Sequence, residues 1–258
     1  MITSCLPQIP GKVAVLLQLL YMGDIYNNGT YLSNNPGWHE EDAGFKAGKI
    51  LELLNRNTLS FKTVCETGCG SGQVLVELCD KLPSNVSMFG YDISKDAIHI
   101  AKKKEATRIK FEQKDITDKE NNDFFDLLLV IDVIEHIENY FGFLRGIAVK
   151  SKYTIFHIPL DLSLWSLFRE KMLIESKNRV GHIHNFTEDF IESILTDNGF
   201  EIVDKLYTEP TFEMISPKQK FINGVRKLLF RINKRFCTKT LGGYSILLLA
   251  KNDLAEKK

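Results

Sequence analysis

The sequence lacks paired cysteines, and it lacks an apolar run that could cross a bilayer. Its five cysteines, at positions 5, 65, 69, 79 and 237, form no C-x-x-C pair, which predicts free thiols in a reducing compartment and argues against a zinc site. The apolar stretch at 13–20 has eight residues, against the ~20 that a transmembrane helix needs, and no small-residue cleavage site follows it. We therefore expect a cytoplasmic protein.

The chain also lacks a net charge, because 33 Lys and Arg residues balance 33 Asp and Glu residues. Global charge therefore does not point to nucleic acid. A hydrophobic content of 44% and a charged content of 26% are typical of a soluble globular protein. At 258 residues the chain is long enough for one α/β domain with an ample core.

Short apolar runs alternate with segments of helical periodicity along most of the sequence. This alternation predicts an α/β fold with a doubly wound, mostly parallel, Rossmann-like sheet and helices on both faces. We expect a lead-in over 1–43 and the domain over 44–258. The expected strands are 61–67, 86–93, 109–115, 125–132, 153–161, 201–209 and 244–252, and the expected helices are 44–56, 73–82, 95–106, 137–150 and 187–199.

Three glycines at alternate positions, Gly68, Gly70 and Gly72, stand between a predicted strand and a predicted helix. Glycine adopts the unusual φ values of such a turn and leaves room for a ligand on the backbone. Asp92, expected at the tip of the next strand, could accept hydrogen bonds from a ribose diol. This arrangement is typical of a cradle for a nucleoside-containing cofactor, although a turn that only reverses the chain remains an alternative. The G-x-G-x-G spacing, with Gln73 next, disfavours a dinucleotide.

The run E-T-G-C-G-S-G resembles the first motif of class I S-adenosylmethionine-dependent methyltransferases. The resemblance implies a seven-stranded sheet whose last strand is antiparallel beside the fifth. It implies that Asp92 holds the ribose and that an acid after the third strand lies near the adenine. The implied cofactor-binding residues are Glu66, Thr67, Gly68, Cys69, Gly70, Gly72, Asp92, Ile93, Asp115, Ile116, Asp132 and Val133.

Three further segments continue the resemblance. The run at 132–136, DVIEH, is similar to the D/E-x-x-E-H run of quinone-type small-molecule methyltransferases, and GHIHNFT is similar to a segment common after their fifth strand. The run WHEEDAGFKA resembles the lead-in of a bacterial subgroup associated with surface-glycan genes. That lead-in implies a lid in which Trp38 covers the cofactor and Lys46 meets its carboxylate. The alternatives are that Trp38 only anchors the core and that Lys46 is a solvated helix residue.

In some quinone-type relatives the acidic run binds a divalent metal, and the corresponding ligands here would be Asp132, Glu135 and His136. Asp132 replaces the more usual glutamate, and we predict no metal. Transfer to an oxygen acceptor instead needs a base to take a proton, and histidine suits that role. His136, then His157, then His182 and His184, lie in segments expected at the carboxyl edge of the sheet. A structural role remains an alternative for each.

Residues 214–241 contain eight basic residues and no acid, so the remainder of the chain carries a net charge of −8. Phe221, Val225, Leu228, Leu229, Ile232 and Phe236 recur at steps of three and four, which predicts one amphipathic helix. Three interpretations remain open: an apolar stripe that covers the domain, contact with the inner membrane surface or a lipid-linked substrate through 216–238, and binding of a phosphorylated substrate or another chain. Nucleic acid is disfavoured because no aromatic stacking set accompanies the charge.

Taken together, the sequence predicts an enzyme that transfers a methyl group from S-adenosylmethionine to a small-molecule acceptor, at a hydroxyl oxygen, leaving S-adenosylhomocysteine. The acceptor would be a sugar, a glycan precursor or a lipid-like compound. Trp165 and Phe168 either line its pocket or close the domain. The alternatives are a nucleotide-cofactor oxidoreductase and a catalytically silent member that binds a cofactor or a partner.

Overall fold

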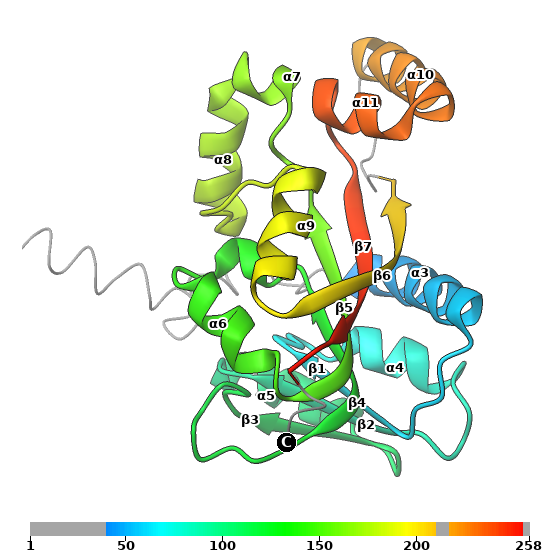
Figure 1. Ribbon diagram of the computed structural model, residues 1–258, viewed down its shortest axis with the longest axis vertical. Helices are drawn as coiled ribbons and strands as arrows, with labels where there is room; N and C mark the ends of the chain where they lie inside the picture. The colour runs from blue at the N-terminus through cyan, green and yellow to red at the C-terminus, as the bar shows by residue number, and fades with distance from the viewer. Residues whose placement is uncertain (1–39, 210–216, 255–258) are drawn as a thin grey trace, which may run out of the picture.

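A computed structural model of the protein describes residues 40–209 and 217–254, with side chains from Lys220 onward in the second range. Seven strands form one sheet in the order β3-β2-β1-β4-β5-β7-β6 (Figure 1). The strands are β1 (Thr63–Thr67), β2 (Ser87–Asp92), β3 (Ile109–Gln113), β4 (Phe125–Ile131), β5 (Ser151–Pro159), β6 (Phe200–Thr208) and β7 (Ser245–Asn252). Only β7 runs antiparallel, between β5 and β6. The predicted fold class is confirmed.

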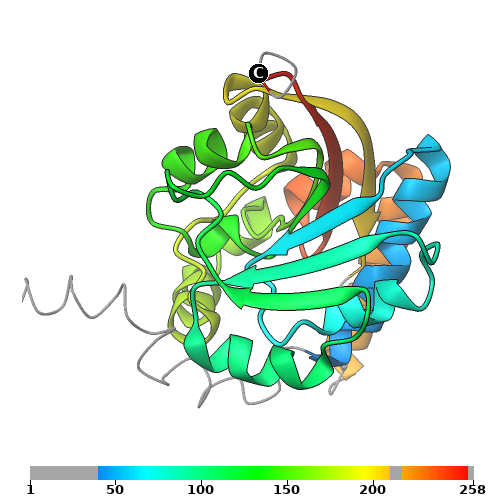
Figure 2. The same cartoon turned by 90° about the horizontal axis from the view of Figure 1, so that it is seen from below.

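Helices cover both faces of this sheet, because successive residues of each buried strand point to opposite sides. On one face, Val64, Leu127 and Leu129 pack with α3 (Glu40–Asn57), α4 (Gln73–Cys79) and α5 (Lys95–Ala101). On the other, Cys65, Leu128 and Val130 pack with α6 (Tyr140–Ile147) and α9 (Glu188–Asp197). Figure 2 shows α3 and α6 on opposite sides of the strands. Two short 3₁₀ turns, Lys102–Lys104 and Ile134–His136, follow α5 and β4.

Two helices form where the sequence predicted no element, α7 (Leu164–Leu167) and α8 (Glu170–Val180). Ser163 caps α7 by accepting a hydrogen bond from the Ser166 amide. None of the eleven residues of α8 is buried, so this helix has no apolar stripe for a pattern to reveal. Together the two helices form a projection above the carboxyl ends of the parallel strands (Figure 1).

The basic segment forms two helices rather than the single one that was predicted. They are α10 (Pro217–Ile232) and α11 (Lys234–Thr240), and they break at Asn233, whose side chain accepts a hydrogen bond from the Phe236 amide. Asn233 thus caps α11, and residues such as asparagine are strongly favoured at that position. The lead-in boundary predicted at 43/44 falls inside α3, which begins at Glu40.

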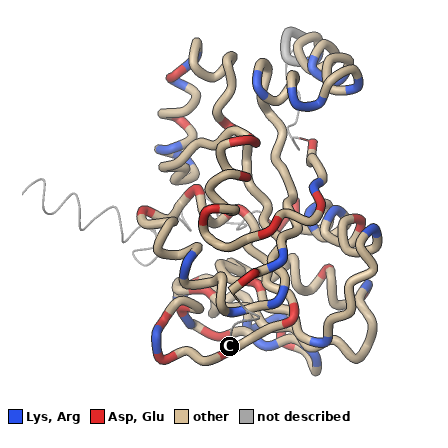
Figure 3. The backbone as a smooth tube through the Cα atoms, viewed as in Figure 1, with Lys and Arg blue, Asp and Glu red and all other residues tan. Residues whose placement is uncertain are grey.

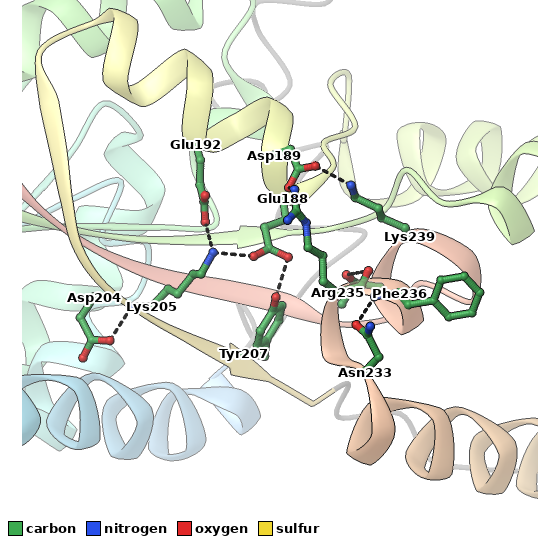
Figure 4. Close-up of polar contacts among 11 residues, drawn as sticks. Glu188, Asp189, Glu192, Asp204, Lys205, Tyr207, Asn233, Arg235, Phe236 and Lys239 are labelled. Atoms are coloured by element: carbon green, nitrogen blue, oxygen red, sulfur yellow. Dashed lines mark hydrogen bonds and ion pairs between the residues drawn. The ribbon is translucent and has the colours of Figure 1, made fainter.

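Charged contacts attach α11 to the domain. Asp189, in the first turn of α9, forms ion pairs with Arg235 at 2.7 Å and with Lys239 (Figure 4). Beside it, the buried Glu188 accepts hydrogen bonds from Lys205 Nζ at 2.7 Å and from the Tyr207 hydroxyl at 2.5 Å. The amino end of α9 therefore joins β6 to the basic insertion.

Two further predictions concern cysteines and membrane spans. Cys65, Cys69, Cys79 and Cys237 are free thiols, and Cys5 lies outside the described residues. Within 40–209 and 217–254, no helix has the length and apolar character needed to cross a bilayer.

Candidate functional site

The carboxyl ends of the parallel strands open into one cleft of about 2350 Å³. Ligand pockets for a single drug-sized molecule usually measure about 300–1,000 Å³, so this cleft has room for a cofactor and an acceptor together. Of the residues predicted from the sequence, most line it: Lys46, Glu66, Thr67, Gly68, Cys69, Gly70, Asp92, Ile93, Asp115, Asp132, Val133, His136, His157 and His182.

Some predicted residues do not line the cleft. Gly72 is the N-cap of α4 and approaches the ring of Phe111, and Ile116 is buried in the core. His184 donates a hydrogen bond from Nε2 to the carbonyl of Ile137 at 3.0 Å, which gives it a structural role. Trp38 lies outside the described residues.

The glycine turn at the end of β1 has left-handed backbone at alternate positions, with φ of 69° at Gly68, 54° at Gly70 and 76° at Gly72. A side chain at Gly68 would also collide with its neighbour, because a Cβ atom there would lie 2.7 Å from Val133 Cγ2. Glycine is therefore required both for the turn and for the close approach of the loop after β4.

Asp92, the last residue of β2, fixes this turn. Its Oδ2 accepts a hydrogen bond from the Gly70 amide at 2.9 Å, and its Oδ1 accepts one from the Ser94 amide at 2.8 Å. Burial raises the pKa of Asp92, and these backbone donors partly oppose the rise. Because each carboxylate oxygen has two lone pairs, both can still accept a hydrogen bond from a ligand in the cleft.

Glu66 is a buried carboxyl whose Oε2 has no hydrogen-bond partner among the described residues. Burial raises its pKa to about 8, and the charge of Lys46 only partly opposes this effect. Buried polar groups are almost always satisfied, so an unsatisfied acid beside a cleft indicates that a ligand supplies the missing donor. A cationic group would suit it best.

Lys46, Asp132, His157 and Thr208 form a connected chain across the floor of the cleft. Lys46 Nζ pairs with Asp132 Oδ2 at 2.8 Å, His157 Nδ1 donates to Asp132 Oδ1 at 2.5 Å, and His157 Nε2 lies 2.9 Å from Thr208 Oγ1. Asp132 has a strained φ of 53°. Burial alone would raise its pKa, but His157 and Lys46 bring it well below its usual range.

This chain changes two of the predicted roles. Lys46 was expected to meet a carboxylate of the cofactor, but in the structure Asp132 supplies its carboxylate partner. Both ring nitrogens of His157 are engaged, by Asp132 and by Thr208, so His157 has no nitrogen left to accept a proton from a substrate. These hydrogen-bonded side chains instead fix the loop after β4, which lies over the glycine turn.

His136 and His182 also line the cleft and lie together, with ring centroids 5.0 Å apart. Nδ1 of His136 donates to the carbonyl of Gly181 at 3.1 Å, and Nδ1 of His182 donates to Asp161 Oδ2 at 2.8 Å. A histidine whose one nitrogen is fixed by a carboxylate presents the other as a proton acceptor. Asp161 was not predicted as a site residue, although it is an acid two positions after the end of β5 and so resembles Asp92 at the end of β2.

Glu135 is buried close to these two histidines. Both of its carboxylate oxygens are buried without hydrogen-bond partners among the described residues. Burial, together with the nearby carboxylate of Asp132, holds its pKa well above the usual range. Glu135, His136 and His182 each offer one ligand atom within 4.8 Å of the others, whereas Asp132 belongs to the Lys46 chain. These three residues could therefore hold a cation, and the absence of a metal stays a prediction.

Asp115 lies at the open edge of the cleft. Its Oδ1 accepts hydrogen bonds from the amide and the hydroxyl of Thr117, at 2.8 and 2.7 Å. Ile93 is exposed nearby, and its carbonyl accepts a hydrogen bond from Gln113. The outer wall of the cleft therefore offers an acid and an apolar side chain next to the ribose-binding candidate, Asp92.

Comparisons with known proteins agree with this geometry. The family model described as "Methyltransferase domain" matches residues 38–205, well over half of the chain. Among curated proteins, no sequence matched.

Solved structures of methyltransferases share the fold. Magnesium protoporphyrin IX methyltransferase from Synechocystis PCC 6803, with bound S-adenosylhomocysteine, has a TM-score of 0.58 and 16% identity, over 91% of this chain and 99% of that one. A putative methyltransferase from Bacillus halodurans C-125 has a TM-score of 0.57 and 15% identity, over 80% and 99%. The N-methyltransferase NodS from Bradyrhizobium japonicum WM9, in complex with S-adenosyl-L-homocysteine, has a TM-score of 0.52 and 14% identity, over 80% and 85%.

The family match and the sheet order lead to the same conclusion. The chain belongs to the methyltransferase-domain family and has the fold of class I S-adenosylmethionine-dependent methyltransferases.

Proposed function

We propose that this protein transfers the methyl group of S-adenosylmethionine to a hydroxyl oxygen of a small-molecule acceptor. One observation carries the proposal: the glycine turn, the carboxylate of Asp92 fixed to it through the Gly70 amide, and the unsatisfied acid of Glu66 all face one cleft. Two of the structures with the same fold hold S-adenosylhomocysteine. The acceptor would be a sugar, a glycan precursor or a lipid-like compound.

The residues present fit this cofactor. Asp92 would accept hydrogen bonds from the ribose diol, and Glu66 would pair with the methionine ammonium, which satisfies its buried oxygen. Ile93 and Asp115 would border the adenine at the open edge. When bound, S-adenosylmethionine supplies an electrophilic methyl group. The protein then has to align the acceptor and exclude water, and positioning of this kind contributes about 7–11 kcal/mol to lowering a barrier.

We assign the base to His182. Its Nδ1 is fixed by Asp161, its ring lines the cleft, and its other nitrogen can take the proton of an acceptor hydroxyl. His136 packs edge-on against it and is oriented by the Gly181 carbonyl, so it positions the His182 ring and the acceptor. His157 acts through Asp132 as a positioning residue. Nothing in the described cleft favours an oxidoreductase.

Isothermal titration with S-adenosylmethionine and with NAD tests the cofactor. We expect micromolar binding of S-adenosylmethionine, weakened about tenfold or more by Asp92→Ala, because the variant loses the fixed acceptor of the ribose. Asp197→Ala, at an exposed position on α9, is the matched control and should bind normally. Binding of NAD without S-adenosylmethionine would overturn the proposal.

Methyl transfer itself is tested with a labelled methyl donor in a native cell extract. Labelled product should form with the wild-type protein and disappear with Gly70→Arg, because position 70 has a φ of 54° and lies in the cradle. Normal cofactor binding without any labelled product would instead identify a catalytically silent member of the family.

A further inference from the structure

Exposed apolar side chains are concentrated around the outer end of the cleft. Among the described residues, eleven of the eighteen large exposed apolar side chains fall within 164–174 and 221–236. They include Phe168, with 81% of its surface exposed, Phe221 with 73% and Ile232 with 74%. Single exposed apolar residues are normal, but a concentration of this kind marks an interaction surface.

Helix α10 is attached to the domain by one side and leaves its apolar stripe outside. The ring of Phe230 stacks on Tyr244, with centroids 4.0 Å apart, and meets Tyr207 edge-on at 5.5 Å. Phe221, Val225, Leu228 and Ile232 recur at helical spacing on another side, and all four are exposed. The predicted stripe therefore does not cover the domain, because Phe230 and its neighbours make that contact instead.

The second apolar set lies on α7 and the start of α8, at the same end of the molecule as α10 (Figure 1). It comprises Leu164, Trp165, Leu167, Phe168, Met172 and Ile174. Trp165 joins the two sets, because it lines a small pocket together with Phe221, Ile222 and Val225. Trp165 and Met172 from one side, and Ile222 and Arg226 from the other, also line the main cleft. The apolar surface is thus the rim of the cleft.

Basic residues accompany the stripe on α10. Lys220, Lys227 and Arg231 recur at i, i+7 and i+11, which places them along one flank of the apolar stripe. All three are exposed. Figure 3 shows Lys and Arg without Asp or Glu along α10 and α11. An apolar stripe beside a basic flank is the arrangement of helices that lie in the interface of an anionic membrane.

We propose that this rim, formed by α7, the start of α8, α10 and α11, docks on an anionic membrane surface. The apolar side chains of the rim enter the boundary between head groups and acyl chains, and the basic flank binds anionic head groups. The cleft then opens directly onto the bilayer. This proposal rests on the proposed methyl transfer, and it narrows the acceptor to an amphiphile whose apolar part stays in the membrane while its hydroxyl reaches the cofactor.

The charge of the surface favours an anionic membrane over a second copy of this chain as its partner. In a symmetric dimer through α10, the basic flank of each copy would lie near that of the other, and like charges would repel. An anionic membrane instead attracts each Lys or Arg near its surface by about 1 kcal/mol. The exposed Trp165 fits the same interpretation, because tryptophan is enriched where a protein crosses from head groups to acyl chains.

Co-sedimentation of the full chain with vesicles tests this surface. Vesicles of phosphatidylcholine with phosphatidylglycerol should retain the protein at low salt, and vesicles of phosphatidylcholine alone should retain it much less. The triple variant Lys220→Gln, Lys227→Gln, Arg231→Gln should bind the anionic vesicles about a hundredfold more weakly. The variant Phe221→Ser, Leu228→Ser, Ile232→Ser should lose retention by a similar factor. High salt should reduce the retention of the wild-type protein by anionic vesicles, because salt shortens the screening length.

Phe124→Ser combined with Val203→Ser is the matched control, because it removes exposed apolar side chains away from the rim and should leave vesicle binding unchanged. Titration of each variant with S-adenosylmethionine separates the two proposals. Vesicle binding without cofactor binding would overturn the methyl transfer and leave the membrane surface standing. Equal retention by neutral vesicles, or cofactor binding with no vesicle retention, would overturn the surface. The membrane surface would also be overturned if light scattering showed that the wild type is a dimer and that the variant Phe221→Ser, Leu228→Ser, Ile232→Ser is a monomer.

Discussion

Asp161 Oδ2 accepts a 2.8 Å hydrogen bond from Nδ1 of His182, although the two residues come from different segments. Asp161 follows β5, and His182 follows α8. The pair therefore links the end of the sheet to the projection that forms one side of the cleft rim. In the proposed reaction it fixes the ring that accepts the proton.

We expect His182→Gln to lower the rate of labelled-methyl transfer by about a hundredfold or more, with the affinity for S-adenosylmethionine unchanged, because glutamine cannot take the proton. His99→Gln, at an exposed position on α5, should leave the rate unaltered. Asp161→Asn should lower the rate less and shift its pH profile, as expected of a positioning residue. A normal rate in His182→Gln would remove this histidine from the mechanism.

Binding of S-adenosylmethionine should release protons near neutral pH. The pKa of Glu66 is raised to about 8 by burial, so the free protein holds this acid protonated, and a ligand ammonium would favour its ionised form. Affinity should therefore rise with pH up to about 8 and then level off. Titrations in buffers of different ionisation enthalpy measure the released protons. Release should vanish in Glu66→Gln and persist in the exposed control Glu201→Gln.

The same group makes the stability of the ligand-free protein depend on pH. Its pKa in the fold, about 8, lies above the ordinary value of 4.5, so its stabilising contribution is complete below pH 4.5 and is lost as pH rises through 8. The loss amounts to about 1.4 kcal/mol per pH unit within that window. Urea unfolding at several pH values should show a smaller decline in Glu66→Gln than in the wild type. Parallel declines would contradict the shift.

Lys46→Met should destabilise the fold by about 1–3 kcal/mol, because it leaves the half-buried carboxylate of Asp132 with one cationic partner fewer. Lys49→Met is the matched control on the same helix. Lys49 pairs with Glu52 at the surface, so its loss should cost under about 1 kcal/mol. Urea unfolding measures both. Adding Asp132→Asn to Lys46→Met should restore part of the lost stability, and purely additive losses would show that the two residues are not coupled.

Asp189→Asn should loosen α11 while the domain stays folded. The pKa of Asp189 lies at about 2 because Arg235 and Lys239 hydrogen-bond its ionised form, and asparagine would weaken both contacts. Since these residues lie near the surface, the global unfolding free energy should fall by under about 1 kcal/mol. Hydrogen exchange of the amides of 234–240 should nevertheless accelerate. Unchanged exchange there would mean that packing, rather than these ion pairs, holds the helix.

Local patterns were enough to predict the cradle. A strand, a turn with alternate glycines and an acid at the end of the next strand are all visible in the sequence. In the structure the Gly70 amide lies 2.9 Å from the Asp92 carboxylate. The state of His157 could not be predicted in this way. Its contacts with Asp132 and Thr208 depend on strand pairing across three different strands, so they belong to tertiary structure.

Helix α8 and the break at Asn233 were missed for different physical reasons. Helix α8 buries no residue, so it lacks the apolar periodicity by which helices are recognised. The break at Asn233 depends on a side-chain cap inside a segment whose periodicity continues across it. Phe221, Val225, Leu228 and Ile232 share one face of α10 as the pattern predicted, but Phe236 belongs to α11. Hydrophobicity alone does not distinguish a stripe that faces the core from one that is exposed.

The position of β7 has a consequence for how the protein is made. Strands β1 to β5 can pair with one another as soon as residue 159 has been synthesised, but β6 pairs only with β7. Until residues 245–252 leave the ribosome, β5 has an open edge and β6 has no neighbour in the sheet. Helices α10 and α11 lie between β6 and β7 in the sequence, so they are synthesised before β7 completes the sheet on which they pack. During that interval their exposed apolar side chains are a binding site for a chaperone.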